Sequence, residues 1–321
     1  MGGDHMPDAA VAGAAEAARE GIHVALVGDP TRLEEACRAH GVTNLQVVPA
    51  EDVIGMDEHA SDVRRRTQSS VMRAAAEVKE GRASALVSMG HSGATMAAAL
   101  FTFGRIKGVE RPAIVANLPS QTGTVTLLDV GANADVKPSM MRQFAVMGRT
   151  YASIMHGIER PSVGLLSIGE EPSKGNELTL AAHELMRDLD GFAGNVEGRD
   201  IFAGTTDVVV TDGFTGNVVL KLAEGEAKTL FGWIREALRS STRAKLGGAL
   251  AKPALKRVAA RLDPSTYGAQ PLIGVAQPTF IGHGSSDARA VANALRFADQ
   301  TVREGVVSRV ADALAAARGD A

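Results

Sequence analysis

The sequence is poor in cysteine and in aromatic residues. Cys37 is the only cysteine among 321 residues, so neither an internal disulfide nor a metal site with several cysteine ligands can form. Aromatic residues make up 4% of the chain, which argues against a site that stacks bases or sugars. The formal net charge of −3 gives the chain as a whole no attraction to nucleic acid. Disulfide-stapled folds, multi-cysteine metal centres and nucleic-acid binding are therefore not expected.

Long hydrophobic runs are also scarce. Residues 1–5 contain neither the basic nor the apolar region of a secretory signal. Residues 83–104 carry no Lys, Arg, Asp or Glu and are long enough to span a membrane, but glycines, serines and His91 interrupt them. A membrane span is rejected on that ground, and a cytoplasmic protein is expected.

Glycine and apolar residues are abundant. With 45% hydrophobic and 22% charged residues, the chain can bury a large core in one domain or two. Its 35 glycines indicate a turn-rich α/β protein rather than a disordered one.

One pattern occurs four times: an apolar strand, a polar loop with glycine, and a helix. This alternation predicts a doubly wound, mostly parallel sheet of the α/β class with helices on both faces. In such sheets the loops that follow the strands gather at a ligand-binding crevice. The predicted strands are residues 83–89, 125–130, 163–168 and 207–211.

The third of these units, residues 163–177, carries the strongest signal for a bound anion. Its apolar run ends at Gly169, charge follows at once, and a helical period begins at Asn176 with Ser173 as the expected N-cap. Lys174 would then lie beside backbone N–H groups at a helix N-terminus, where an anion is favoured. The alternative is an ordinary turn with a solvated lysine.

A fifth glycine loop contains His283, flanked by Gly282 and Gly284. A lone histidine is weak evidence for a site, but its place before another predicted helix, residues 288–317, strengthens it. A helix is also expected at residues 62–79, and the basic triplet at 64–66 is interpreted as its solvated face.

Residues 226–262 differ from the rest of the chain in charge. They hold nine basic and two acidic residues, a local charge of +7. Apolar stripes and the only tryptophan, Trp233, predict two amphipathic helices separated by Gly247, Gly248 and Pro253. Such helices suit an anionic membrane surface or an acidic partner. Packing at a helical subunit interface is the alternative, and the two roles are compatible.

Several sequence motifs are absent or incomplete. Neither the dinucleotide fingerprint nor the P-loop occurs, and no second histidine completes a zinc motif after His183. Residues 90–94 fall one glycine short of a hydrolase nucleophile elbow, with Ser92 as nucleophile and His283 as its base. No cofactor and no metal are expected, and a serine hydrolase stays open as an alternative.

Six ordered motifs, taken together, resemble the bacterial phosphate acyltransferase family (PlsX) of phospholipid synthesis. They cover nearly the whole chain and lie at residues 1–5, 128–133, 169–177, 196–200, 211–217 and 283–287.

The resemblance implies transfer of a fatty acyl group from acyl carrier protein to inorganic phosphate, which gives acyl phosphate. It implies a fold similar to isopropylmalate dehydrogenases and phosphotransacetylases, a homodimer, no nicotinamide cofactor, and peripheral association with the inner face of the cytoplasmic membrane. We expect one domain, 1–321, with 226–262 inserted as a protruding basic helical pair. A phosphotransacetylase acting on acyl-CoA is a further alternative.

Thioester chemistry and these motifs together indicate which residues form the active site. A thiol is a good leaving group, so the enzyme mainly needs to hold phosphate against the carbonyl and to stabilise the oxyanion. Lys174 and Asn217 are assigned that work, and His5 and His283 are weaker candidates for orienting phosphate or protonating the thiolate. The expected binding residues are Asp4, Gly90, His91, Ser92, Gly93, Asn133, Asn176, Glu177, Asp212 and Gly216.

The chain departs from the family pattern at three places. The family usually has a short strand before Met-Gly-Gly-Asp, so truncation at the N-terminus is expected. His91 and Ser92 stand where the family typically has Asn-Thr, and Ser167 where Asn is usual. These replacements keep polar groups in the loops.

Overall fold

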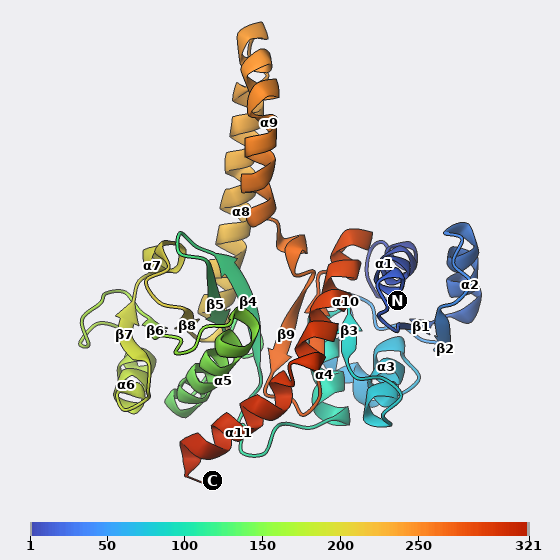
Figure 1. Ribbon diagram of the computed structural model, residues 1–321. Helices are drawn as coiled ribbons and strands as arrows, with labels where there is room; N and C mark the ends of the chain where they lie inside the picture. The colour runs from blue at the N-terminus through green and yellow to red at the C-terminus, as the bar shows by residue number, and fades with distance from the viewer. Residues whose placement is uncertain (1, 320–321) are drawn as a thin grey trace.

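The computed structural model describes residues 2–319 and contains an eight-stranded mixed sheet (Figure 1). The α/β class and the mostly parallel sheet predicted from the sequence are confirmed. The order across the sheet is β3 (Leu86–Ser88), β10 (Thr279–Gly282), β9 (Ala269–Ile273), β4 (Ala113–Pro119), β5 (Thr124–Leu128), β8 (Val208–Val210), β6 (Val163–Leu166) and β7 (Phe192–Val196).

The strand direction reverses in the middle of the sheet. β5, β8, β6 and β7 are parallel to one another, and β3 is parallel to β10. Antiparallel pairs join β10 to β9, β9 to β4 and β4 to β5. The loops after β5, β8 and β6 therefore leave one edge of the sheet, here called the lower edge, and the loops after β3 and β10 leave the opposite, upper edge.

Helices cover both faces of the sheet. On one face α5 contacts α6, α11, β5 and β8, and its buried residues include Phe144 and Tyr151. On the other face α4 and α8 lie over β10, β4 and β5. The helices of these layers are α4 (Ser92–Thr102), α5 (Pro138–His156), α6 (Glu177–Met186), α7 (Gly198–Ala203), α8 (Gly213–Ala237), α10 (Ala288–Arg303) and α11 (Val306–Arg318).

The N-terminal part of the chain packs against one end of the sheet. α1 lies along α10, and β1 pairs with β2 in a separate two-stranded parallel sheet (Figure 1). The elements are α1 (Asp8–Arg19), β1 (Ala25–Gly28), α2 (Pro30–Ala39), β2 (Gln46–Pro49), the short 3-10 helix η1 (Ala60–Arg64) and α3 (Ser70–Lys79).

The predicted basic helical pair is a hairpin of α8 and α9 (Thr242–Arg261) that projects from the body (Figure 1). The turn lies at residues 238–241, so the predicted separation at Gly247–Pro253 is wrong. Ser241 caps α9 by accepting from the N–H of Ala244, which starts the helix before the glycines. In the described part of the chain no helix is long and apolar enough to cross a membrane.

Other predicted element boundaries also need correction. The helix expected at 62–79 is split into η1 and α3, because Arg66 binds Asp52 and Glu58 instead of facing solvent. The helix expected at 288–317 breaks at Gly305, which has φ +63°.

The strand expected at 163–168 ends at Leu166. Ile168 is 79% exposed rather than buried, since the chain has already left the sheet. The helix that follows is capped by Asn176, not by Ser173, through a reciprocal bond with Thr179.

Candidate active site

A cavity of about 1050 Å³ runs along β4 between the two edges of the sheet. Gly131 and Asn217 line its lower end. Ser92 and His283 line its upper end, together with the residues at the base of the helical hairpin. The structure therefore brings four of the predicted glycine loops to one cavity or its edge, but divides them between two ends.

The separation of the two ends follows from strand register. Ile114, beside the lower loops, pairs with Leu272 on β9, whereas Gly282 pairs with Ala269. Three residues of an antiparallel strand span about 10 Å. Asn217 and His283 therefore lie toward different ends of the same cavity.

Asp129 organises the lower end. Its side chain is fully buried and accepts hydrogen bonds from the backbone N–H groups of Ile114, Gly131, Ala132 and Asn133 at 2.7–3.1 Å. Burial raises the pKa of this carboxyl, and the N–H donors act in the opposite direction. The loop after β5 is thus wrapped around one carboxylate.

Two predicted residues of this end also hold the loop in place. The Asn133 amide donates to the carbonyl of Pro112 at 2.7 Å and to Asp129 at 2.9 Å. Asp212 caps α8 by accepting from the N–H and hydroxyl of Thr215. Both side chains therefore have a structural role at this end of the cavity.

Close packing brings α8 against this loop. A Cβ on Gly216 would lie 1.9 Å from the carbonyl oxygen of Asp129, so only glycine fits there. Asn217 is the next residue, and its side chain lies beside Gly131, where a Cβ would be 3.8 Å away. The exposed Asn217 amide is thereby presented to the cavity.

Lys174 lies on the neighbouring loop, between β6 and α6, at the same lower edge. Asn195 of β7 holds this loop in place. Its amide donates to the carbonyl of Glu171 at 2.9 Å and to that of Lys174 at 3.4 Å. Ser167 donates to the same Lys174 carbonyl at 3.1 Å. The Lys174 side chain is exposed and does not belong to the cavity lining.

Buried His183 orients Asn195. Its Nδ1 lies 2.9 Å from Asn195 Oδ1, which must accept because the amide nitrogen is donating to the loop. The proton is therefore on Nδ1 of His183. Asn176 and Glu177 begin α6 at the end of this loop, where Asn176 serves as the N-cap.

Predicted residues of the upper end lie at the start of helices. His91 caps α4 by accepting from the N–H of Ala94 at 3.1 Å, and Ser92 is the first residue of that helix. The N–H of Asp4 donates to the carbonyl of Gly284 at 2.8 Å, which joins the N-terminal loop to the His283 loop.

The remaining predicted residues of this end play backbone roles. Gly90 packs against Gly2, where an added Cβ would come within 3.4 Å of the Gly2 Cα. Gly93 faces Ala60 in the same way, at 3.0 Å. His5 is exposed in the turn before α1, and its carbonyl accepts from Ala9.

His283 forms its hydrogen bonds within its own loop. Nδ1 of His283 lies 2.7 Å from the Ser285 hydroxyl and 3.2 Å from the Ser285 N–H. Because the backbone N–H can only donate, Nδ1 is the acceptor and the proton lies on Nε2. This arrangement does not pair His283 with Ser92 as a hydrolase would require.

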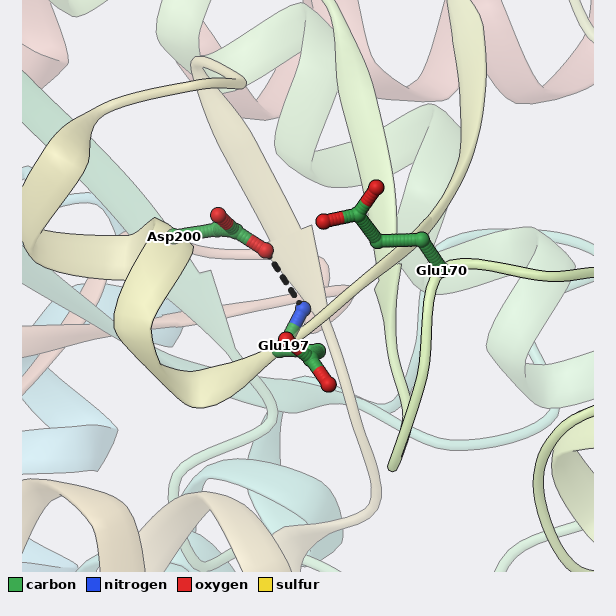
Figure 2. Close-up of side chains that lie close together, drawn as sticks. All are labelled: Glu170, Glu197 and Asp200. Carbon is green, nitrogen blue, oxygen red and sulfur yellow. Dashed lines mark hydrogen bonds between the residues drawn. The ribbon is translucent and has the colours of Figure 1, made fainter.

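Glu170, Glu197 and Asp200 form a cluster of carboxylates near the Lys174 loop (Figure 2). Arg199 forms ion pairs with both glutamates, at 3.1 Å and 2.6 Å. Asp200 accepts from the N–H of Glu197 at 2.7 Å, the bond drawn in Figure 2. Arg199 offsets one of the three negative charges and ties the Glu170 loop to α7.

Sequence reasoning missed Asp129, Asn195 and His183 as functional residues. Asp129 lies inside the motif at 128–133, directly after an apolar strand, and that position was an available signal. Asn195 and His183 gave no local signal, because their partners are 12 to 24 residues away in sequence.

Comparison with known proteins places this geometry in a family. Residues 1–309 match the family model described as "Fatty acid synthesis protein". The phosphate acyltransferase of Thermus thermophilus is 57% identical over 318 residues, covering 98% of this chain and 97% of that protein. The phosphate acyltransferase of Deinococcus radiodurans is 58% identical over 273 residues, covering 83% of this chain and 76% of that protein.

Solved structures agree at the level of fold. A phosphotransacetylase from Streptococcus pyogenes superimposes with a TM-score of 0.59 at 18% identity, covering 93% of this chain and 92% of that one. The 4-hydroxythreonine-4-phosphate dehydrogenase from Klebsiella pneumoniae gives 0.51 at 14% identity, covering 92% and 94%.

Proposed function

This chain belongs to the fatty acid synthesis protein family, whose curated relatives are phosphate acyltransferases, and on that premise we propose that its acyl donor is fatty acyl-[acyl carrier protein]. The enzyme transfers an acyl group to phosphate for fatty acid and phospholipid synthesis. The basic hairpin supports the choice of donor, because its +7 charge over residues 226–262 suits an acidic carrier protein.

The proposed reaction is direct attack of phosphate on the thioester. A phosphate oxygen forms a bond to the carbonyl carbon, the carbon–sulfur bond breaks, and the proton of hydrogen phosphate passes to the departing thiolate. The products are acyl phosphate and the free thiol of the carrier. A thiol ionises near pKa ~8.5, so it leaves readily and no protein nucleophile is required.

We assign the reacting groups to the lower end of the cavity. Asn217 faces the cavity there, and Lys174 lies on the adjacent loop of the same edge. The Lys174 ammonium and the Asn217 amide would stabilise the oxyanion and hold phosphate. Asn133, Asn176 and Asp212 support these groups by holding the loops.

The polar loops of the upper end form a second set. In this assignment the amides of residues 90–93 and the His283 ring do not hold the phosphate, because Ser92 and His283 line the other end of the cavity. In the same assignment Asp4 and His5 at the upper end, and Glu177 and Gly216 at the lower end, act through loop geometry rather than as ligands. The phosphate site therefore rests on the groups of the lower edge.

We propose that the hairpin is the surface that binds the carrier protein and the membrane. Its local charge of +7 suits the acidic carrier protein and the anionic inner face of the cytoplasmic membrane. Exposed apolar residues such as Trp233 and Leu250 would enter the membrane interface. In this proposal the chain is one acyltransferase domain, 1–321, that forms a homodimer in the cytoplasm.

The test measures free thiol released from palmitoyl-[acyl carrier protein] with and without inorganic phosphate. Release that requires phosphate, with acyl phosphate trapped by hydroxylamine, is the expected result. Release indifferent to phosphate would identify a hydrolase. A strong preference for acyl-CoA over the carrier-bound donor would identify a phosphotransacetylase instead.

A further inference from the structure

The cavity beside β4 has an apolar section that no step of the phosphate chemistry uses. Its floor is formed by Ile114, Ala116 and Leu118, which alternate along β4 and so share one face of the sheet. All three are buried in the same apolar cluster as Leu220 of α8. The floor is therefore apolar, and on the α8 wall Lys221 and Glu224, which pair with each other at 2.9 Å, lie among the apolar lining residues.

The residues of α8 that line the cavity are regularly spaced along the helix. Asn217, Leu220, Ala223 and Ala227 line the cavity and recur every three or four residues, which places them on one face of the helix. Asn217 begins this row at the lower end, and Ala227 ends it at the upper edge. Ala223 and Ala227 present only methyl groups to the cavity.

The length of this section matches that of a membrane-lipid acyl chain. Ten helical residues from Asn217 to Ala227 rise about 15 Å. The hydrocarbon core of a bilayer is about 30 Å thick, so a chain in one leaflet extends about 15 Å. A chain with its carbonyl at Asn217 would thus end near Ala227, next to Ala260 and Leu262.

We propose that the fatty acyl chain lies between β4 and α8, and that Ala223 and Ala227 determine the longest chain accepted. This inference rests on the proposed function and assigns a site to its apolar substrate. The carbonyl carbon lies at Asn217 and the methyl end lies at the base of the hairpin. A larger side chain at Ala227 would remove the last part of the channel, and one at Ala223 would shorten it further.

The experiment measures kcat/KM for octanoyl, dodecanoyl and palmitoyl donors on acyl carrier protein with Ala227→Leu and Ala223→Leu. Ala227→Leu is expected to lower the palmitoyl value about tenfold or more while octanoyl transfer persists, since a few methylenes in an apolar pocket are worth that factor. Ala223→Leu should extend the loss to dodecanoyl. Ala316→Leu makes the same change on an exposed position of α11 and should preserve the wild-type profile.

Retained octanoyl transfer shows that each variant is folded. Leu262→Ala provides a change in the opposite direction, because it enlarges the distal end and should raise relative activity on chains longer than palmitoyl. Equal loss at every chain length, or a change in oligomeric state with an unchanged length profile, would overturn the proposal. Absence of phosphate-dependent transfer in the wild type would instead refute the proposed function.

Discussion

Single polar residues hold the active-site loops through bonds to backbone groups. Asp129 accepts from four backbone N–H groups, and Asn195 donates to two carbonyls of the Lys174 loop. Each of these side chains is buried, and an unmatched partner would cost about 1–3 kcal/mol. The groups proposed for chemistry, Lys174 and Asn217, are exposed by contrast. Positioning and chemistry are thus divided between different residues.

Lys174 is expected to contribute charge and not stability. Its loop is held through its carbonyl, which Lys174→Ala leaves in place. The variant should lose about a hundredfold or more in kcat, the usual effect of removing an oxyanion-stabilising group, and should unfold at the wild-type denaturant concentration. Lys79→Ala, an exposed lysine at the end of α3, is the matched control. Full turnover in a folded Lys174→Ala enzyme would refute the assignment.

His156 is expected to make stability depend on pH. Its Nε2 lies 3.1 Å from Asn117 Oδ1 and 3.2 Å from the Thr126 hydroxyl. Burial lowers the pKa of this ring, and the charge of Asp207 acts in the opposite direction. Below the unfolded pKa of about 6.5 the unfolded chain binds a proton that the folded chain does not, so stability falls as pH drops.

The measurement is the free energy of unfolding in urea at about pH 7.5 and about pH 5.5, which bracket that pKa. His156→Gln keeps a donor for Asn117 and should lose less stability than the wild type over this interval. His23→Gln, on the surface, should follow the wild type. An equal loss in His156→Gln and the wild type would remove His156 as the cause.

At the scale of elements, α8 serves two environments along its length. Its first turns pack on the loop after β5, where Gly216 and Leu220 are buried. Its later turns leave the body and pair with α9, which has no buried residue in the described chain (Figure 1). One continuous helix therefore links the proposed reaction centre to the proposed docking surface.

Charge reversal tests the hairpin as that docking surface. Arg235→Glu with Arg239→Glu should raise KM for the acyl carrier protein donor about tenfold or more, given about 1 kcal/mol for each basic group at an anionic surface. KM for phosphate should stay unchanged, because Arg235 and Arg239 lie near the turn of the hairpin, whereas Asn217 lies near the start of α8. Lys107→Glu with Arg309→Glu gives the same change in net charge elsewhere on the surface. An equal rise in KM for the control pair would show that only net charge matters.

At the scale of the whole molecule, the reversal of strand direction shapes the cavity. A wholly parallel sheet would place every glycine loop at one edge. Here β9 and β4 run antiparallel to their neighbours, so the His283 and Ser92 loops leave the upper edge and the Asn217 and Lys174 loops leave the lower one. The cavity extends between these edges along β4, which makes it long enough for an extended chain.

The sequence by itself determined the α/β class, the loops that carry the candidate groups and the basic helical pair. Local patterns in the sequence predict these properties: apolar runs, glycine after strands, and the helical spacing of Leu230 and Ile234. The six motifs also sufficed to place the chain in its family.

Only the tertiary structure decided which loops share an end of the cavity. That outcome depends on β4 and β9, which pair across more than 140 residues and have no local signature that separates antiparallel from parallel pairing. The tertiary structure also revealed the roles of Asn195 and His183, whose partners are distant in sequence. Long-range pairing and burial, which local patterns do not encode, set the distance between Asn217 and His283.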